Sequence, residues 1–395
     1  MPMTGYDVLI VGGGVVGSSI AYFLSANGDS RALRIAVVEQ DSTYAHSSTA
    51  LSVGGIRQQF STRENIALSL FSAEFFREAP RTLAVGSEEP DLGFQEAGYL
   101  FLASSQGLPV LERNLEKQRR LGADVRLLLP GELGARFPWL NVSDLSAGSL
   151  GASKEGWLDP HSLLQGFRKK ARSQEVVYLE DRVIGFSMAG GRVTEANLAE
   201  AGRVPVGQVV NAAGPMAAGL ARLAGITDLP VRPRKRFVYR IQTSASLPGC
   251  PMVIDTSGVY LRPEGDGFLC GVAPPTTADP DTLDLDMEYG LFHETVWPAL
   301  AHRVPALDSL RLGPSWAGHY ALNPLDRNAI LGPHSDIQNF LFANGFSGHG
   351  LQQSPGIGRA LSELILHGEY RTLDLGRFSF HRFAEGALVL EENVV

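Results

Sequence analysis

The stretch DVLIVGGGVVGSSIAYFL, residues 7–24, decides the fold. Its apolar run from Val8 to Val11 is typical of a parallel strand that is buried on both faces, and the following apolar residues are spaced as on one side of a helix. Between strand and helix, Gly12, Gly14 and Gly17 have the spacing G-x-G-x-x-G. The first glycine permits a tight turn, the second lets the backbone approach a pyrophosphate, and the third lets helix and strand pack closely.

The surroundings of this glycine triplet support a dinucleotide site. The start of the helix offers free N–H groups and a partial positive charge to a phosphate. A second apolar run, RIAVVE, ends at Glu39, whose carboxylate can accept hydrogen bonds from an adenosine ribose. The alternative is a glycine-rich turn with Glu39 as an ordinary solvated strand end. The motif predicts dinucleotide binding and leaves open whether the cofactor is NAD or FAD.

Composition excludes several other classes of protein. The chain has 395 residues, 44% of them hydrophobic, and a net charge of −8, which argues against nucleic-acid binding. We expect no transmembrane span, no export signal and no metal site, because long apolar runs, a basic N-terminal region and paired histidines are all missing from the sequence. Two cysteines in a chain of this size favour reduced thiols and a cytoplasmic location. The oligomeric state is left open.

The rest of the chain does not continue as a simple NAD dehydrogenase. After Glu39 comes a hydroxyl-rich loop, HSSTALSVGGIRQQF, and two strand-rich blocks follow later. The turn VVNAAGP and the late run FLFANGFSGHG both return to the pattern of a buried strand followed by a small-residue turn. We therefore predict an α/β (α+β) fold with a discontinuous Rossmann-type FAD-binding domain and a second, antiparallel β-rich substrate domain. The expected bounds are 1–90, 150–228 and 326–382 for the first, 91–149 and 229–325 for the second, and 383–395 for a C-terminal tail.

Several motifs together resemble a known family. The glycine triplet with Glu39, VVNAAGP, the helix start GWLDP and the turn GFSGHG are similar to those of the D-amino-acid-oxidase-like FAD oxidoreductases. The branch with sarcosine oxidase and dimethylglycine dehydrogenase is nearest. Within it, STALSVGGIRQQFS, SWAGHY, GFSGHGLQQSPGIGRA and the tail FSFHRFAEGALVLEENVV look like the "FAD-dependent oxidoreductase domain-containing" (FOXRED) group. The resemblance covers essentially the whole chain and implies FAD as the cofactor.

The late turn would hold the flavin ring. Its glycines can bring bare N–H groups close to a flat ligand, and the N-terminus of the next helix would stabilise negative charge on a reduced flavin. His349 and Gln352 could donate hydrogen bonds there, or could instead fix the turn and cap the helix. The expected FAD-binding residues are Gly12, Gly14, Val16, Gly17, Glu39, Gln40, Ser47, Ser48, Thr49, Val183, Ala212, Ala213, Gly214, Gly345, Gly348, His349, Gly350, Leu351 and Gln352.

The candidate substrate-binding residues are inferred mainly from the resemblance. Arg57 aligns with the arginine that binds the substrate carboxylate in the sarcosine-oxidase branch, and a guanidinium can hold a carboxylate with two parallel hydrogen bonds. Tyr260 resembles a tyrosine that faces the pocket, and His319 lies where the β-rich block rejoins the flavin domain. With His349 and Gln352, these residues are the candidate catalytic set. Structural roles, as an ion pair or as strand residues, are the alternatives. The basic run RPRKR, residues 232–236, is expected to be solvated.

The sequence differs from that branch at three points that affect the predicted chemistry. The cysteine that attaches FAD is missing from residues 316–320, which predicts non-covalent FAD. Leu269 or Cys270 stands where the branch has an oxygen-activating lysine, which favours an electron acceptor other than oxygen. Gln352 replaces a second carboxylate-binding lysine.

The predicted function is oxidation of the C–N bond of an amino acid or of a secondary or N-methyl amine by hydride transfer to flavin N5. The resulting imine would then be hydrolysed. One alternative is a flavoprotein assembly or scaffold factor with structural FAD, and another is an FAD-dependent 2-hydroxy-acid or polyol dehydrogenase. The sequence does not identify the substrate.

Overall fold

The computed structural model describes residues 5–26 and 33–393. Its first sheet has eight described strands, with the main order β18-β19-β11-β1-β2-β8. Neighbouring strands from β19 to β8 are parallel, and β18 is antiparallel to β19. The bounds are β1 (Tyr6–Val11), β2 (Ile35–Glu39), β8 (Val177–Glu180), β11 (Gly202–Asn211), β18 (Ile330–Pro333) and β19 (Phe340–Asn344), with the antiparallel branch β9 (Val183–Ala189) and β10 (Arg192–Leu198).

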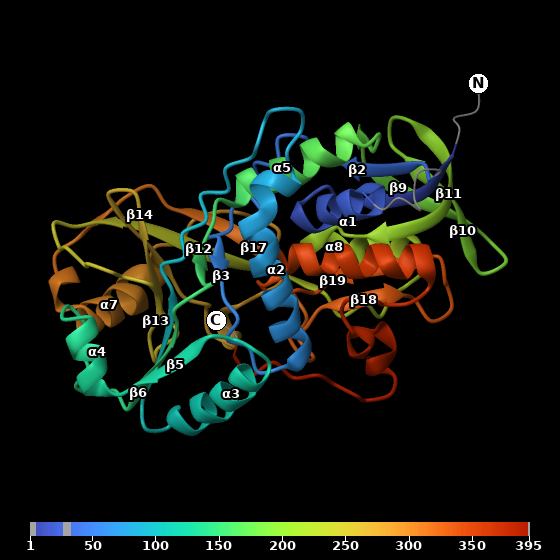
Figure 1. Cartoon of the computed structure of the whole chain (residues 1–395). Coiled ribbons are helices and arrows are strands. Elements are labelled where there is room, and N and C mark those ends of the chain that lie inside the picture. Colours follow the sequence, from blue (N-terminus) through green and yellow to red (C-terminus); the bar gives the residue numbers. More distant parts are fainter. Residues whose placement is uncertain (1–4, 27–32, 394–395) are drawn as a thin grey trace.

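Helices cover this sheet because its strands are apolar on both faces. On one face lie α1 (Val15–Ala26), α5 (Pro160–Ser173) and α8 (Gly350–His367), and Figure 1 shows α1 and α8 side by side. The opposite face packs against β9, β10 and α6 (Ala217–Leu223). The expected helix start at GWLDP is confirmed, because the Asp159 carboxylate accepts a hydrogen bond from the His161 N–H at 2.9 Å.

The second sheet is built mainly from antiparallel pairs, in the order β16-β12-β15-β14-β13-β4-β6-β5, with β17 paired to β12. Only the pairing of β13 with β4 is parallel among its described strand pairs. The bounds are β4 (Tyr99–Ala103), β5 (Val125–Leu128), β6 (Ala147–Gly151), β12 (Arg232–Gln242), β13 (Met252–Ile254), β14 (Tyr260–Glu264), β15 (Gly267–Gly271), β16 (Arg311–Leu312) and β17 (Trp316–Leu322). Cys250 and Cys270 are buried free thiols in this part of the molecule.

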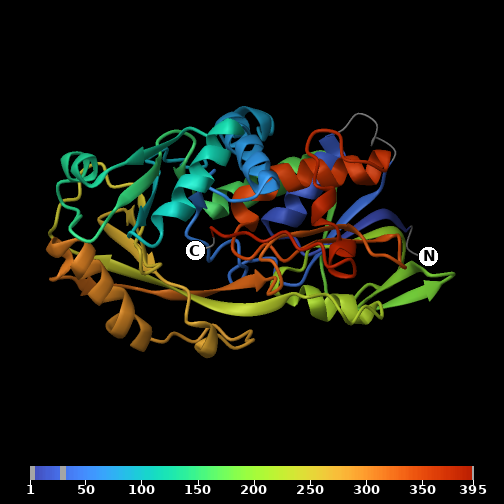
Figure 2. The same cartoon turned by 90° about the horizontal axis from the view of Figure 1, so that it is seen from below.

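The two sheets lie at opposite ends of an elongated molecule, with α2 (Arg63–Thr82) between them (Figures 1 and 2). A short ladder of β3 (Gly55–Ile56) and β7 (Gly156–Trp157) lies close to α2, and the last described residues also reach this central region. The mixed α/β fold predicted from the sequence is confirmed. The predicted domain boundaries stay a prediction.

The block from 231 to 325 is less uniform than its strand-like sequence suggested. Besides strands it contains a π-helical turn (Phe292–Val296) that leads into α7 (Trp297–Arg303), where Phe292, Val296 and Leu300 recur every four residues and are buried. That spacing places them on one helical face. The remaining helices are α3 (Leu108–Arg120), α4 (Pro130–Arg136) and short 3₁₀ turns at Gly214–Met216, Thr276–Ala278, Pro305–Leu307, Gly376–Phe378 and Phe380–Phe383.

Candidate active site

A cavity of about 1200 Å³ runs from the carboxyl ends of β1 and β2 to the second sheet. A crevice outside the carboxyl ends of parallel strands is the usual ligand site of such sheets. Most residues that the sequence predicted for cofactor or substrate line this cavity. They are Gly12, Gly14, Val16, Glu39, Gln40, Ser47, Ser48, Thr49, Arg57, Val183, Ala212, Ala213, Gly214, Tyr260, His319, Gly348, His349, Gly350, Leu351 and Gln352.

The nucleotide end of the cavity is shaped by close backbone approach. Gly12 has φ of 104°, and a Cβ there would lie 2.4 Å from the Ala212 carbonyl oxygen, so only glycine fits the turn. The Gly13 N–H donates to Glu39 Oε2 at 2.8 Å, and the Asp41 N–H donates to Glu39 Oε1 at 3.0 Å. Glu39 is therefore no loosely solvated strand end, because its carboxylate ties the glycine turn to the end of β2.

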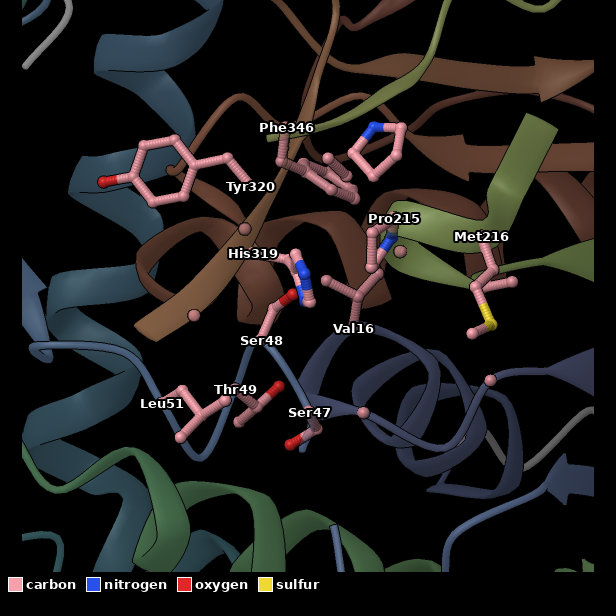
Figure 3. Close-up of a pocket in the computed structure, with 18 of the residues that line it drawn as sticks. Val16, Ser47, Ser48, Thr49, Leu51, Pro215, Met216, His319, Tyr320 and Phe346 are labelled. Atoms are coloured by element: carbon pink, nitrogen blue, oxygen red, sulfur yellow. The ribbon is translucent and has the colours of Figure 1, made fainter. Parts of the chain in front are cut away.

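The hydroxyl-rich loop folds over the start of α1. Thr49 Oγ1 accepts a hydrogen bond from the Val15 N–H at 3.1 Å, and the Ser48 hydroxyl is buried without a hydrogen-bond partner among the described residues. Figure 3 shows Ser47, Ser48 and Thr49 on one side of the cavity and Phe346 on the opposite side. A buried hydroxyl without a protein partner in a large cavity fits a polar ligand group at this point.

The late turn is fixed to β17 and opens onto the same cavity. The Ser347 N–H donates to the Ala321 carbonyl and the Asn323 N–H donates to Ser347 Oγ, both at 3.0 Å. Gly348 has φ of 96°, and a Cβ there would lie 2.4 Å from the Tyr320 ring. The glycine thus permits close packing of Tyr320, and the first turn of α8 follows with its N-terminus at the cavity.

Two predicted cofactor glycines, Gly17 and Gly345, do not line the cavity. A Cβ on Gly17 would lie 1.9 Å from the Gly12 carbonyl oxygen, so this glycine permits the contact between α1 and the preceding turn. Gly345 has φ of 68° and packs beside Asn323 and Ile330. Both glycines shape the backbone behind the cavity wall.

Arg57 lies at the substrate end and is buried, with 2% of its surface exposed. Its guanidinium carbon lies 3.8 Å from the centroid of the Phe60 ring, which is a cation–π contact. Nη1 donates to the Gln59 carbonyl, and Nη2 donates to the Asn393 carbonyl at 2.6 Å. Burial lowers the pKa of Arg57, yet a guanidinium remains protonated in proteins.

His349 and Gln352, at the start of α8, both contact Arg57. His349 Nε2 lies 3.1 Å from Arg57 Nη2, and Gln352 Oε1 accepts a hydrogen bond from the Arg57 backbone N–H at 2.9 Å. Burial, and next the positive charge of Arg57, hold the pKa of His349 well below its usual value. The imidazole is therefore neutral and accepts the Arg57 hydrogen bond through Nε2.

Three tyrosines line the same cavity as Arg57: Tyr99, Tyr260 and Tyr320. Burial raises the pKa of each hydroxyl, so all three stay protonated and can donate hydrogen bonds. Gly271 leaves room for one of them, because a Cβ there would lie 2.7 Å from the Tyr260 hydroxyl. Tyr99 was not predicted from the sequence, because it is part of the apolar strand β4 and belongs to no motif.

His319 lies beneath a loop, residues 272–290, that also contributes to the cavity wall. His319 Nε2 is 3.1 Å from the Asp284 carbonyl oxygen, and burial lowers the pKa of this histidine. The same loop binds the basic run of β12. Arg236 makes two hydrogen bonds to the Asp279 carboxylate, at 2.8 and 2.9 Å, and the Lys235 ammonium lies 2.8 Å from Asp284 Oδ1.

The expectation that the RPRKR run is solvated is therefore wrong for residues 234–236. Their side chains are 19%, 13% and 13% exposed, and each forms ion pairs with acidic residues of the loop. Alternation along the strand did not reveal these partners, because the acidic residues lie more than forty positions later in the sequence.

The donor set fits an FAD. The glycine turn and the start of α1 would hold a pyrophosphate, and the Glu39 carboxylate at the end of β2 would accept hydrogen bonds from a ribose. The N-terminus of α8 opens onto the same cavity as Arg57 and the tyrosines, where it would stabilise negative charge on a flavin. Fold and cavity together define a flavin-dependent oxidoreductase. The chain belongs to the FAD dependent oxidoreductase family (DAO), whose pattern matches residues 7–364.

Comparison with known proteins supports this assignment. The chain is 44% identical to the "FAD-dependent oxidoreductase domain-containing protein 1" of Xenopus laevis, over 100% of this chain and 86% of that protein. It is 26% identical to the sarcosine oxidase subunit beta of an Arthrobacter species, over 99% and 94% of the two chains. The structure resembles L-proline dehydrogenase from P. horikoshii with a TM-score of 0.87 and 28% identity, covering 98% and 100% of the chains. The family resemblance and the FAD cofactor predicted from the sequence are confirmed.

Within residues 5–26 and 33–393, no helix has the length and apolar character needed to cross a bilayer. The same described residues contain no group of three or more His, Cys, Asp or Glu side chains arranged to hold a metal ion.

Proposed function

We propose that this protein oxidises the C–N bond of an amino acid or an N-substituted amino acid, with FAD as the electron acceptor. The observation that carries the proposal is Arg57, a buried cation in the same cavity as the FAD-binding glycines. A buried guanidinium beside a cofactor site suits a substrate carboxylate and would orient the adjacent carbon.

The residues around Arg57 would prepare the substrate rather than exchange covalent bonds with it. Arg57 would bind the carboxylate, while the hydroxyls of Tyr99, Tyr260 and Tyr320 offer hydrogen-bond donors along the cavity wall. Because His349 is neutral, the positive charge of the His349–Arg57 pair is carried by Arg57. The bound flavin supplies a two-electron oxidant. The substrate carbon next to a neutral amine nitrogen would give up its hydrogen with two electrons while the nitrogen lone pair forms the C=N bond. Water then hydrolyses this imine to a carbonyl compound and an amine.

Two finer points belong to the same proposal. FAD is bound without a covalent bond to cysteine, which fits the placement of both cysteines outside the cavity lining. The electron acceptor is a partner other than oxygen, because Leu269 and Cys270, which stand where the sarcosine-oxidase branch has an oxygen-activating lysine, are uncharged. A cytoplasmic location agrees with two free thiols.

The test is anaerobic reduction of the purified, FAD-loaded protein by a panel of D- and L-amino acids, N-methyl amino acids and 2-hydroxy acids. Bleaching of the flavin absorbance by an amine, with a ketone or aldehyde product after hydrolysis, is the expected result. Bleaching by hydroxy acids alone would instead assign the protein as an alcohol-oxidising dehydrogenase. Arg57→Ala should retain its FAD and lose at least about 100-fold in affinity for the carboxylate substrate.

A matched control for Arg57→Ala is Arg120→Ala, which removes an exposed arginine whose contact is Glu116 on the same helix. This control should leave both FAD content and substrate affinity unchanged. Loss of FAD from Arg57→Ala, with Arg120→Ala unaffected, would contradict the carboxylate role of Arg57.

A second candidate is a flavoprotein scaffold in which FAD has a structural role. One observation favours it, because the Asn393 carbonyl and His349 Nε2 occupy the Arg57 Nη2 hydrogens that a carboxylate would use. A protein that binds FAD tightly and is bleached by no member of the panel would support this second candidate.

A further inference from the structure

The C-terminal tail, of which the structure describes residues 383–393, reaches the substrate site. The Asn393 carbonyl accepts a hydrogen bond from Arg57 Nη2 at 2.6 Å, although 336 positions separate the two residues in the sequence. Figures 1 and 2 both place this end of the chain in the central region between the sheets. From the sequence, this tail was predicted as a separate segment without a role in the site.

The tail is held there by a buried carboxylate. Glu391 is 6% exposed, and its Oε1 accepts hydrogen bonds from the N–H groups of Ser61 at 2.7 Å and Asn393 at 3.0 Å. Its Oε2 accepts from the Thr62 hydroxyl and from Asn65 Nδ2, each at 2.9 Å. These groups lie at the N-terminus of α2, where the helix dipole favours a negative charge.

Asn393 is fixed by a second contact of its own. Its side-chain Nδ2 donates to the Gln59 carbonyl at 2.6 Å, and Gln59 O also accepts the hydrogen bond from Arg57 Nη1. The tail and the segment that follows Arg57 therefore form one hydrogen-bonded unit. The placement of the Asn393 carbonyl on Arg57 is consequently determined by several contacts.

The hydrogens of Arg57 limit what the residue can offer to a ligand. A guanidinium has five N–H donors, and a carboxylate takes two parallel ones, either from Nε and Nη2 or from Nη1 and Nη2. Both hydrogens of Nη2 have protein acceptors here, one being the Asn393 carbonyl and the other His349 Nε2. While the tail is in place, neither pair of N–H groups that could bind a carboxylate, Nε with Nη2 or Nη1 with Nη2, is fully available to a ligand.

We propose that Asn393 is a specificity-determining residue of the substrate site, because its carbonyl decides whether Arg57 meets an acid with one N–H or with two. The inference rests on the proposed role of Arg57 as the carboxylate site. With the tail bound, Arg57 discriminates weakly between an acid and the corresponding neutral amide. With the Asn393 carbonyl displaced, Arg57 prefers the acid, because a two-pronged, charge-assisted contact becomes possible.

The test compares benzoate and benzamide as probes of equal shape on the FAD-loaded protein, with binding measured by calorimetry. In a chain that ends at Asn393, the carbonyl becomes one oxygen of a terminal carboxylate and holds Arg57 more firmly. We expect this chain to bind benzoate about tenfold more weakly than the full chain and to bind benzamide equally well. Asn393→Gly removes the contact to Gln59 and adds no charge, and it should raise benzoate affinity about threefold.

The neighbouring residue supplies the matched control. The Glu392 side chain makes an exposed contact, with Oε2 3.3 Å from Arg113 Nη2, and its backbone N–H donates to Ser61 Oγ at 2.8 Å. Because Glu392→Gln keeps the backbone contact and alters an exposed one, this variant should bind both probes like the full chain. The inference is overturned if the chain ending at Asn393 and the Asn393→Gly variant keep the benzoate-to-benzamide ratio of the full chain. If Arg57→Ala also leaves benzoate binding unchanged, the proposed carboxylate site itself fails. Loss of benzoate binding in Arg57→Ala without any effect of the tail would overturn only the present inference.

Discussion

The nucleotide end and the substrate end of the cavity are built in different ways. The nucleotide end is shaped by backbone, because Gly12 in the cavity wall and Gly17 behind it both stand where a Cβ would collide with a neighbouring carbonyl oxygen. At the substrate end the wall is side chain, and Arg57 is held by contacts from α8 and from the C-terminal tail. Backbone geometry of this kind can be recognised from the spacing of glycines in the sequence, whereas contacts between side chains from distant segments can hardly be recognised at all.

The two ends should therefore fail differently when they are altered. Substitutions at the nucleotide end should act on folding and on FAD content together, because the backbone turn and the sheet are inseparable there. Substitutions at the substrate end should act on stability or ligand affinity in smaller steps, because each contact is one of several.

Gly17→Ala should be the most damaging change. The added Cβ would lie 1.9 Å from the Gly12 carbonyl oxygen, so α1 must move away from the glycine turn. We expect a loss of about 3 kcal/mol or more in the free energy of unfolding, together with loss of bound flavin, as measured by denaturant titration and flavin absorbance. Gly131→Ala in α4 is the control, because Gly131 lies outside the cavity lining and no atom lies within 4 Å of its added Cβ. If the two variants had the same free energy of unfolding and the same flavin content, the proposed difference between the two ends of the cavity would be wrong.

Glu155 should make stability depend on pH. Burial raises the pKa of this carboxyl to about 7 from 4.5, although it accepts hydrogen bonds from the Gln58 N–H at 2.6 Å and Gln59 Nε2 at 2.9 Å. Between these values the folded protein keeps a proton that the unfolded chain releases. The free energy of unfolding should therefore fall by up to about 3 kcal/mol as pH rises from 4.5 to 7, and this contribution should be constant above that.

Glu155→Gln tests the source of that pH dependence. The amide does not titrate, so the decline in unfolding free energy between pH 4.5 and 7 should become shallower than in the unaltered chain. Denaturant titrations at several pH values measure the slope for both proteins. An unchanged slope in Glu155→Gln would assign the pH dependence to other groups.

Glu391→Ala should release the tail. It leaves the N–H groups of Ser61 and Thr62 at the start of α2 without their carboxylate acceptor, and we expect a loss of about 2 kcal/mol in the free energy of unfolding. Glu392→Ala, which removes an exposed neighbour on the same tail, should change the free energy of unfolding by less than about 0.5 kcal/mol. Thermal unfolding of both variants measures the difference, and similar melting temperatures would show that the tail contributes little.

Asp279→Asn should have the smallest effect of the set. It weakens the two hydrogen bonds between Arg236 and the loop over His319, and it retains one acceptor oxygen. We expect a loss of about 1 kcal/mol in the free energy of unfolding at low salt. If the loop contacts are mainly ionic, added salt should reduce the gap between this variant and the unaltered chain. A gap that salt leaves unchanged would indicate a packing role for Asp279.

The contrast also explains what could be predicted from the sequence. The strand, glycine turn and helix of residues 7–24, the end of β2 at Glu39 and the start of α8 all follow from local spacing, and the structure has them. The family resemblance added FAD and pointed to Arg57 as a substrate residue. What Arg57 contacts was beyond such reasoning, because Asn393 and His349 lie about 300 positions away in the chain.

Other residues carried no sequence signal at all. Tyr99 belongs to an apolar strand, Glu155 precedes a short ladder, and Glu391 looks like a solvated terminal carboxylate. Only the folded chain buries them and gives them partners. The acidic partners of the RPRKR run were missed for the same reason, since a strand pattern describes which face a side chain takes and not what covers that face.

The two buried thiols can serve as probes of local opening in the part of the molecule built on the second sheet. Burial raises the pKa of the Cys250 thiol to about 12 and raises that of Cys270 further, so a thiolate-seeking reagent meets almost no reactive sulfur in the folded protein. Since both cysteines belong to the half of the molecule with the second sheet, the rate at which they are alkylated measures how often that half opens, without any signal from the nucleotide-binding half.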